Sequence, residues 1–326
     1  MGTQQTVLVT GAGGFIGSHL AERLVELGAR TRALVRYNSA NAWGWLDHSP
    51  VKDHVEVFLG DVRDRDSLRH VLDGVDVVFH LAALIGIPYS YHAPVSYVRT
   101  NVEGTLNLLQ AAQEAGVKRF VHTSTSEVYG TARYVPIDEQ HPLQGQSPYS
   151  ASKIAADKMA EAFHRSFELP VVTVRPFNTF GPRQSARAVV PTIITQCLSD
   201  GVVRLGSLHP LRDLNYVTDI VEGYVRAAET AEAVGKTVNL GSGREISMQD
   251  LARMIAELLG KRVEIVQEQA RVRPEASEVD RLLADTTLAR RLLGWQPAVS
   301  LEEGLRTTIA WMQDHRDGYR SNVYAV

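Results

Sequence analysis

Short apolar runs alternate with longer amphipathic stretches over the first half of the chain. The runs are rich in β-branched residues, which is typical of buried strands, and the stretches between them carry apolar residues at helical spacing. Strands are expected at 6–10, 31–35, 55–58, 75–82, 119–124 and 171–176, and helices at about 15–27, 64–73, 95–115 and 149–167. Strands that alternate with helices in this way predict an α/β fold with a doubly wound parallel sheet.

The alternation breaks after Pro176, where proline-containing loops separate further helices. These helices are expected near 188–200, 219–231, 247–259 and 301–314, and residues 237–240 have the pattern of one more strand. We therefore predict a first domain over residues 1–176 and a smaller α/β lobe over residues 177–326 that closes over the carboxyl edge of the sheet. Residues 210–245 are expected to rejoin the first domain.

Composition and charge exclude several classes of protein. A chain of 326 residues suits one large domain with a smaller lobe. A net charge of -3 gives no electrostatic reason to expect a nucleic acid or an anionic membrane as partner. The chain has 1 cysteine, Cys197, which cannot form an internal disulfide, so we expect a cytoplasmic location. The apolar start at residues 6–10 is too short to span a bilayer.

A glycine-rich turn links the first strand to the first helix. In "VLVTGAGGFIGSHL", Gly11 permits a tight turn, Gly14 lets backbone N–H groups approach a pyrophosphate, and Gly17 lets the helix pack close to the strand. A glycine triplet alone is a weak signal, but a strand, this turn and a helix in sequence are the context that a dinucleotide site requires. We expect the turn, including Phe15 and Ile16, to bind NAD(P).

The carboxylate that usually selects NAD is missing from the end of the second strand. The segment offers Arg36 there, and an arginine at that place pairs with the 2′-phosphate of NADP, so the sequence slightly favours NADP over NAD. The alternative is that Arg36 is a solvated surface charge. Asp61, at the end of the third strand, is a candidate for the adenine edge or, equally, for a helix cap.

The stretch "SPYSASK" places Tyr149 and Lys153 four residues apart, on one face of a predicted helix. Tyrosine is a weak base at neutral pH, and a nearby lysine ammonium favours its phenolate form. Such a pair can take a proton from a carbinol while a nicotinamide takes the hydride. Chance also produces this spacing, but behind a dinucleotide turn it predicts a redox pair.

These motifs and several others match one family. In order they are "TGAGGFIGSHL", "GDVRD", "HLAA", "NVEGT", "STSEVYG", "PYSASK", "RPFNTFGP", "RDLNYVTD", "NLGSG" and "LGWQP". Through them, almost the whole chain resembles the extended short-chain dehydrogenase/reductases that act on nucleotide sugars, which have a Rossmann fold. The resemblance implies a hydride-transfer triad of Thr125, Tyr149 and Lys153, with Asn101 as a relay or a structural neighbour. It also implies cofactor contacts in these motifs from Val62, Leu81, Ala82, Ala83, Asn101 and Pro176.

Glu127 separates the chemistries found within this family. Once C4 of the sugar is a ketone, the C5 hydrogen is acidic, and a carboxylate beside the redox site can remove it while the C6 hydroxyl leaves as water. Alternation along an extended strand would place Glu127 on the same side as Thr125. Ser126 stands where dTDP-glucose 4,6-dehydratases carry an aspartic acid, so Glu127 is expected to serve as both base and acid. The alternative is a glutamate that only caps the strand end.

Longer segments such as "YNSANAWGWLD" and "IPYSYHAP" resemble the 4,6-dehydratases of legionaminic-acid-type pathways, which act on GDP-N-acetylglucosamine. We therefore expect a 4,6-dehydratase that forms a 4-keto-6-deoxy sugar nucleotide from GDP- or UDP-N-acetylglucosamine. A 4-epimerase and a UDP-glucuronate decarboxylase are the enzymatic alternatives. An NAD(P)-sensing binding protein is the non-enzymatic one, although such a protein would have no need of both Tyr149 and Lys153.

The resemblance also places substrate contacts in the second lobe and predicts a homodimer. Guanidinium groups pair well with a diphosphate. The expected substrate residues are Asn178, Arg183, Arg187, Val190, Arg212 and Arg273, with a solvated-charge alternative open for Arg183 and Arg187. The helices near 95–115 and 149–167 form a four-helix dimer interface in the family, or are plain core helices. No histidine spacing indicates a metal site.

Overall fold

The computed structural model describes residues 5–199, 201–316 and 319. Its centre is a seven-stranded sheet in the order β11-β6-β5-β4-β1-β2-β3, in which every neighbouring pair is parallel. The strands are β1 (Thr6–Thr10), β2 (Arg30–Arg36), β3 (Val55–Gly60), β4 (Val77–His80), β5 (Arg119–Thr123), β6 (Val171–Pro176) and β11 (Thr237–Leu240). The predicted doubly wound α/β fold is therefore confirmed, and the strand expected at 237–240 joins the main sheet beside β6.

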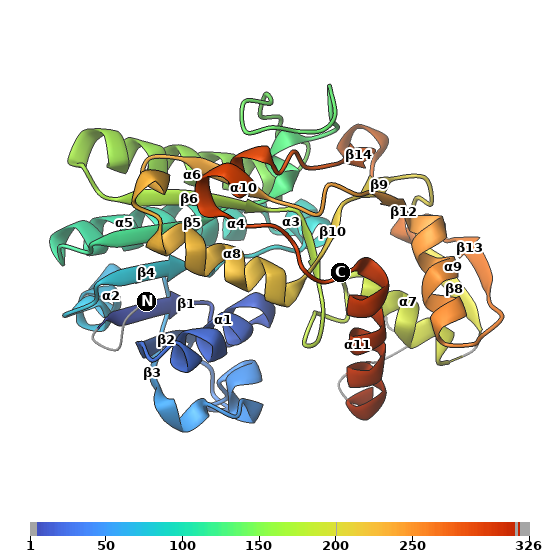
Figure 1. Ribbon diagram of the computed structural model, residues 1–326, viewed down its shortest axis with the longest axis horizontal. Coiled ribbons are helices and arrows are strands. Elements are labelled where there is room, and N and C mark those ends of the chain that lie inside the picture. The colour runs from blue at the N-terminus through green and yellow to red at the C-terminus, as the bar shows by residue number, and fades with distance from the viewer. Residues whose placement is uncertain (1–4, 200, 317–318, 320–326) are drawn as a thin grey trace.

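Helices cover both faces of this sheet (Figure 1). Side chains alternate along β1: Val7 and Val9 belong to the apolar cluster on the side of α1 (Phe15–Glu26) and α8 (Val217–Glu229), whereas Leu8 belongs to the opposite cluster. The opposite face is covered by α2 (Arg65–Leu72), α5 (Gly104–Glu114) and α6 (Pro148–Phe167). Burial on both faces explains why apolar and β-branched residues predominate in strands such as β1 and β4.

The segment expected as one helix over 95–115 has a different internal geometry. It is built from α4 (Pro94–Tyr97), a π-helical stretch (Val98–Glu103) and α5, and a further short helix, α3 (Ile87–His92), precedes it. A π-helical stretch inserts an extra residue into the helical ladder, and such stretches are frequent at functional sites. Here the stretch carries Asn101, whose position decides how this helix meets the redox site.

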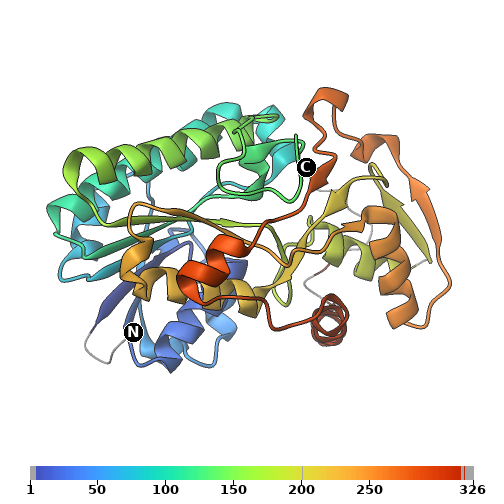
Figure 2. The ribbon, with the colours of Figure 1, turned by 45° about the horizontal axis from the view of Figure 1, so that its top comes forward.

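The second lobe lies beyond the carboxyl ends of the sheet strands, as Figures 1 and 2 show. Its helices are α7 (Val189–Cys197), α9 (Met248–Leu258) and α11 (Leu301–Asp314). A fourth helix, α10 (Thr287–Leu293), returns toward β11. Residue 200, the last of the helix expected at 188–200, lies outside the described residues. Its short strands pair as β7 (Asn178–Phe180) with β10 (Leu214–Tyr216), β8 (Val202–Leu205) with β13 (Glu264–Gln267), and β9 (Leu211–Arg212) with both β12 (Ile246–Ser247) and β14 (Arg281–Leu282).

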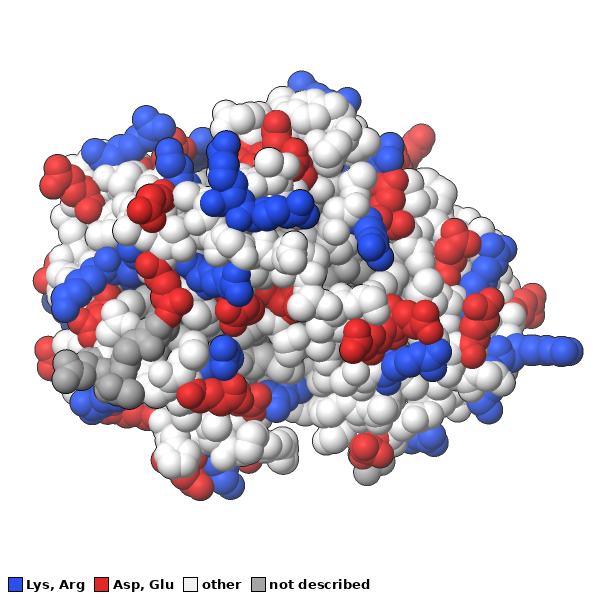
Figure 3. Space-filling model, viewed as in Figure 1, with Lys and Arg blue, Asp and Glu red and all other residues white. Residues whose placement is uncertain are grey.

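The surface shows no single-sign field on the face seen in Figure 3, where acidic and basic side chains are interspersed. None of the helices in the described part of the chain is long and apolar enough to cross a membrane. Cys197 is a buried free thiol in α7, and burial raises its pKa to about 11.

Candidate active site

The glycine turn has the geometry that a dinucleotide requires. Gly11 adopts a φ of 70°, and a Cβ on Gly17 would lie 2.3 Å from the Gly11 carbonyl oxygen, so a larger residue at either position would distort the turn. Gly14 is the N-cap of α1 and supplies no side-chain cap, which leaves the first-turn N–H groups available to an anionic pyrophosphate. Phe15 and Ile16 begin α1 directly after this turn. The residues present therefore fit a dinucleotide cofactor.

The loop after β4 runs beside the glycine turn. The backbone N–H groups of Leu81 and Ala82 each donate to Thr10 Oγ1 over 3.1 Å. A Cβ on Gly11 would come within 2.9 Å of the Ala82 nitrogen, so the two loops are in direct contact. Leu81 and Ala82 thus lie next to the glycine turn, and the cofactor contact expected of residues 81–83 stays a prediction.

At the end of β2, Arg36 is exposed, and its positive charge acts on Asp61. A hydrogen bond from Arg63 is the main cause that lowers the Asp61 pKa, with a smaller contribution from Arg36. The loop after β2 folds back over the glycine turn, where the Trp45 N–H donates to the Gly13 carbonyl over 3.0 Å. No pattern in the sequence indicates this contact, because it joins two loops through backbone atoms alone.

The redox pair lies at the start of α6. Ser147 caps this helix with a reciprocal hydrogen-bond pair to Ser150, which fixes the helix start just before Tyr149. Tyr149 is 7% exposed and packs with Ile87 and Tyr97, whose ring meets that of Tyr149 edge-on at 6.2 Å. Burial raises the Tyr149 pKa, a hydrogen bond with Thr125 lowers it, and the negative charge of Glu127 raises it.

Lys153 extends from α6 toward the end of β5. Its Nζ donates to the Thr123 carbonyl over 2.6 Å, and the residue is 4% exposed. Burial lowers the Lys153 pKa to about 8, and the negative charge of Asp157 opposes that shift. Lys153 follows Tyr149 by about one turn of α6, as the predicted pairing of the two side chains requires.

Glu127 is near the redox pair for a reason other than the one predicted. The strand β5 ends at Thr123, and Ser126–Tyr129 form a 3-10 turn that Thr125 caps by accepting a hydrogen bond from the Glu127 N–H at 3.2 Å. The prediction from strand alternation was therefore wrong, because the Thr125 hydroxyl bends the chain before residue 127. The charge of Glu127 still acts on Tyr149. Ser126 is 2% exposed in the same turn.

Asn101 is a structural partner of the redox helix. Its Nδ2 donates to the Leu84 carbonyl and to Ser152 Oγ, each over 2.9 Å, and its Oδ1 accepts from the Leu84 N–H at 2.8 Å. These bonds occupy the amide with protein groups and tie the loop after β4 to α6. The contact that we predicted between Asn101 and the cofactor stays a prediction.

The second lobe brings a cluster of arginines to the same edge. Arg212 is 6% exposed, and burial lowers its pKa while the charge of Glu127 in the first domain raises it. Glu278 lies between Arg212 and Arg273, with nitrogen to oxygen distances of 3.7 and 3.6 Å. The buried Oδ1 of Asn178 has no hydrogen-bond partner. Glu278 therefore orients both guanidinium groups before an anionic ligand binds at this edge.

The other three predicted substrate residues have different surroundings. Arg183 has a φ of 70° and binds α1, with its Nη2 2.8 Å from Glu22 Oε1 and its Nη1 3.2 Å from Ser18 Oγ. Arg187 is exposed, and its charge acts on Tyr97, whose ring meets that of Tyr149. The Val190 side chain is fully buried in the core, which leaves only its N–H in the first turn of α7 to face a ligand.

Sequence reasoning missed two buried carboxylates. Asp157 follows Lys153 by one helical turn and is hydrogen-bonded to Arg175. Asp213 is fully buried and accepts hydrogen bonds from the N–H groups of Ser242 and Gly243, so it shapes the "NLGSG" loop. The spacing of Asp157 from Lys153 was a usable signal, whereas the partners of Asp213 are remote in sequence. Among the described residues, no group of three or more His, Cys, Asp or Glu could hold a metal ion.

Known proteins resemble the chain along almost its full length. The family model described as GDP-mannose 4,6 dehydratase matches residues 8–308. A dTDP-glucose 4,6-dehydratase of Streptomyces griseus is 37% identical over 98% of this chain and 97% of that protein. A UDP-glucose 4-epimerase of Mycolicibacterium smegmatis is 34% identical over 94% of this chain and 98% of that protein. Both dehydratases and epimerases are therefore relatives.

A solved structure adds the cofactor. DesIV, a dTDP-glucose 4,6-dehydratase from Streptomyces venezuelae with NAD bound, has a TM-score of 0.85 and 31% identity, covering 97% of this chain and 99% of that one. The NAD in this neighbour gives no support to the preference for NADP that Arg36 suggested. The chain belongs to the extended short-chain dehydrogenase/reductases, in the family of NAD-dependent nucleotide-sugar 4,6-dehydratases and epimerases.

Proposed function

We propose that the protein is a nucleotide-sugar 4,6-dehydratase that converts its substrate into a 4-keto-6-deoxy sugar nucleotide. The observation that carries the proposal is the carboxylate of Glu127, whose charge acts on the buried redox residue Tyr149. An epimerase needs no base at this place, since it only rotates a keto sugar and returns the hydride. A dehydratase needs a base there to remove the C5 proton.

The roles of the side chains follow from their positions. When bound, NAD supplies the hydride chemistry, taking a hydride from C4 and returning it to C6. Tyr149, with Thr125 and Lys153, takes the proton of the C4 hydroxyl. Glu127 takes the C5 proton and gives a proton to the C6 hydroxyl, which leaves as water. Ser126, next to it in the turn, offers only a hydroxyl group, so Glu127 serves as both base and acid.

The proton balance is specific to dehydration. The product keeps its C4 ketone, so the proton taken by Tyr149 does not return to the C4 oxygen. C5 regains one proton when C6 receives the hydride, and the proton that Tyr149 took from the C4 hydroxyl balances this gain. The sum is the loss of one water molecule, with the cofactor unchanged at the end of the cycle.

The substrate that we propose is GDP- or UDP-N-acetylglucosamine. Support comes from the resemblance of the long segments around "YNSANAWGWLD" and from the pair Arg212 and Arg273, which lies at the same edge as Glu127. Asn178, Arg183, Arg187 and Val190 complete the proposed substrate site. For the cofactor we propose NAD, because a neighbour of the same family holds it.

We also propose a homodimer formed through α5 and α6. Apolar side chains are exposed along this side of the molecule: Val98 is 55% exposed and Met159 on α6 is 37% exposed. The predicted four-helix interface would cover them. The cytoplasmic location stays a prediction that rests on Cys197.

A panel of substrates tests the proposed function. The purified protein is incubated with GDP-, UDP- and dTDP-linked hexoses, including the N-acetylglucosamine forms, and the product masses are recorded. Loss of one water from a GDP- or UDP-N-acetylglucosamine supports the proposal. Unchanged mass with an inverted C4 would identify the 4-epimerase that the Mycolicibacterium relative suggests, and loss of carbon dioxide from a uronate would identify a decarboxylase.

A further inference from the structure

A buried carboxylate lies directly behind the redox lysine. Asp157 follows Lys153 by four residues in α6, so both side chains leave the same face of the helix, and both residues are about equally buried, at 5% and 4% exposed. The chemistry proposed above gives Asp157 no part. A carboxylate without water around it is costly unless protein groups satisfy it.

Protein groups from two strands satisfy this carboxylate. On one oxygen, Oδ1, it accepts a hydrogen bond from His122 Nε2 at 3.1 Å. On the other, Oδ2, it accepts from Ser124 Oγ at 2.7 Å and from Arg175 Nη2 at 2.9 Å and Nε at 3.2 Å. His122 Nδ1 is buried without a partner, which fits a neutral ring whose proton is on Nε2.

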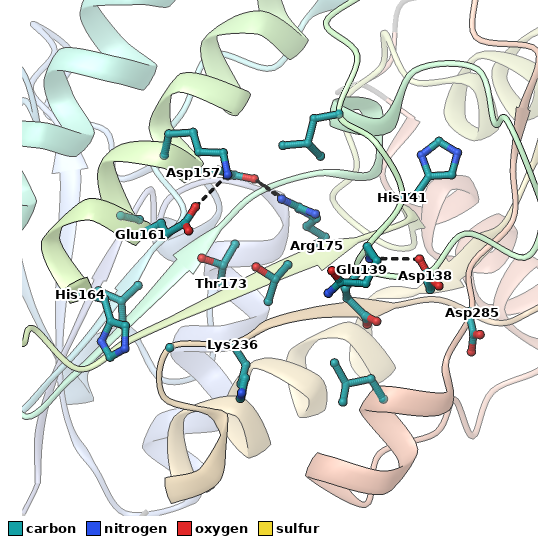
Figure 4. A pocket seen from close by; sticks show the side chains of 18 of the residues that line it. Asp138, Glu139, His141, Asp157, Glu161, His164, Thr173, Arg175, Lys236 and Asp285 are labelled. Carbon is teal, nitrogen blue, oxygen red and sulfur yellow. Dashed lines mark hydrogen bonds and ion pairs between the residues drawn. The ribbon is translucent and has the colours of Figure 1, made fainter.

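The same carboxylate forms part of the wall of a cavity. The cavity, of about 760 Å³, opens beside α6 over β6 and β11, and both Asp157 and Arg175 line it. Figure 4 shows the ion pair between these two residues at the cavity wall, with Thr173 and Glu139 nearby. The ion pair of Asp157 and Arg175 therefore belongs to the wall of this cavity.

Asp157 carries its charge at every pH at which an enzyme works. Burial would raise its pKa, but the hydrogen bond from His122 and the positive charges of Arg175 and Lys153 outweigh burial and lower that pKa to about 2. Burial acts on Lys153 by disfavouring its ammonium form, and it lowers the Lys153 pKa to about 8. The charge of Asp157 opposes that shift. A fixed negative charge thus faces an ammonium group that burial drives toward its neutral form.

We propose that Asp157 is a positioning residue of the redox reaction, whose carboxylate, held by His122, Ser124 and Arg175, is the buried counter-charge that keeps Lys153 an ammonium ion. A neutral lysine no longer favours the phenolate of Tyr149, so Asp157 acts on catalysis through Lys153. The inference rests on the proposed oxidation at C4, and is independent of the later steps at C5 and C6.

Other charged and titratable groups surround this pair, and the test must account for them. His80 on β4, His122 on β5, Tyr149 on α6 and Arg175 on β6 interact with Lys153 or Asp157 directly. Glu127 and Tyr224 interact with Tyr149, and Tyr129 and Glu139 interact with Arg175 or with each other. Because several charges surround the lysine, the measurement must observe Lys153 itself rather than activity alone.

The test is a titration of Lys153 in the NAD-loaded protein. Lysine labelled with carbon-13 at Cε is followed by NMR, and the Lys153 resonance is assigned with Lys153→Arg. In the wild type its midpoint is expected near pH 8. In Asp157→Asn the midpoint is expected to fall by about one pH unit or more, the effect of removing an opposite charge at close range. An unchanged or higher midpoint would overturn the proposal. If Asp157 served only to hold the structure through its ion pair with Arg175, its loss would admit water around Lys153 and raise the Lys153 midpoint.

Two further variants keep the result interpretable. Arg175→Gln breaks the same ion pair but leaves the carboxylate, so its Lys153 midpoint should not fall; a fall as large as that of Asp157→Asn would refute the role of the carboxylate. If Asp157→Asn does not fold, the double variant Asp157→Asn with Arg175→Gln replaces the ion pair by two neutral amides and should still show the lowered midpoint.

Activity provides the second readout. With the sugar nucleotide identified by the substrate panel, the alkaline limb of the pH profile for cofactor reduction should move to lower pH in Asp157→Asn, by the same amount as the lysine midpoint. If Asp157→Asn lowers the maximal rate of cofactor reduction but leaves the alkaline limb of its pH profile at the wild-type pH, the result contradicts the proposal. If no panel member reacts, the proposed function fails, while the lysine titration still decides the role of Asp157.

Discussion

The negative charge of Glu127 in the first domain acts on the guanidinium of Arg212 in the second lobe. Burial lowers the pKa of Arg212, and the charge of Glu127 is the largest opposing contribution. Glu127 follows β5 in the first domain, whereas Arg212 ends β9 in the second lobe. The charge of the proposed base therefore acts both on Tyr149 of the predicted redox pair and on Arg212 of the proposed diphosphate site.

Glu127→Gln should abolish loss of water while NAD stays bound. The amide keeps the shape of the side chain but cannot take a proton from C5, so oxidation at C4 can occur and elimination cannot. Product mass measures elimination, and NADH absorbance under single-turnover conditions measures oxidation. Glu302→Gln, an exposed change on α11, is the control and should behave as the wild type. Undiminished water loss in Glu127→Gln would refute the role of this residue.

The cofactor prediction can be checked without substrate. Protein purified and then denatured should release NAD rather than NADP, identified by mass spectrometry. Arg36→Ala should not change that ratio, because Arg36 is exposed and acts on Asp61. Release of NADP from the wild type, and its loss in Arg36→Ala, would restore the prediction made from the sequence.

Much of the fold was predictable because burial on both faces gives parallel strands short runs rich in apolar and β-branched residues. All seven main strands were expected from this pattern, including β11. The π-helical stretch Val98–Glu103 was not predicted from the sequence. Its extra residue changes the backbone hydrogen bonding, and the spacing of apolar side chains does not reveal that change. The short strand pairs of the second lobe were missed for a related reason: strands of two or three residues carry too little pattern.

The site was predictable where its residues belong to local motifs. Tyr149 and Lys153 share a helix turn, and Thr125 and Glu127 are two residues apart. Glu278 and Asp213 were missed, because their partners come from segments far away along the chain. The bend at Thr125 was missed too, since a threonine in a strand and a threonine that caps a turn look alike in sequence.

Acid should destabilise the protein through Asp157. The Asp157 pKa falls from 3.8 in the unfolded chain to about 2 in the fold. The stabilisation is therefore fully present above pH 3.8 and is lost as the pH falls through about 2, and it amounts to about 2 kcal/mol. Urea unfolding at about pH 5 and about pH 3 should record about half of this loss, because the lower pH lies between the two pKa values. Asp157→Asn should be less stable at the higher pH and should lose less stability between the two; an equal loss in both proteins would contradict this prediction.

Val98→Asp should convert the proposed homodimer into monomers. Val98 is 55% exposed at the start of the π-helical stretch, and a carboxylate there would be buried without a partner in a four-helix interface. Light scattering coupled to gel filtration gives the mass in solution. Tyr37→Asp, at a residue that is 71% exposed after β2, is the control and should leave the mass unchanged. A Val98→Asp protein with the mass of a dimer would place the interface elsewhere.

The return of the chain from the second lobe as β11 limits how this protein can be re-engineered. Cutting after β6 would remove α8 and β11 together, uncover the edge of β6 and expose the apolar face beneath α8. The specificity of a relative therefore cannot be transplanted as one C-terminal block. A chimera must exchange two separate segments, about 177–216 and 241–316, and keep the native 217–240 between them, so that donor loops are grafted onto a recipient sheet that stays whole.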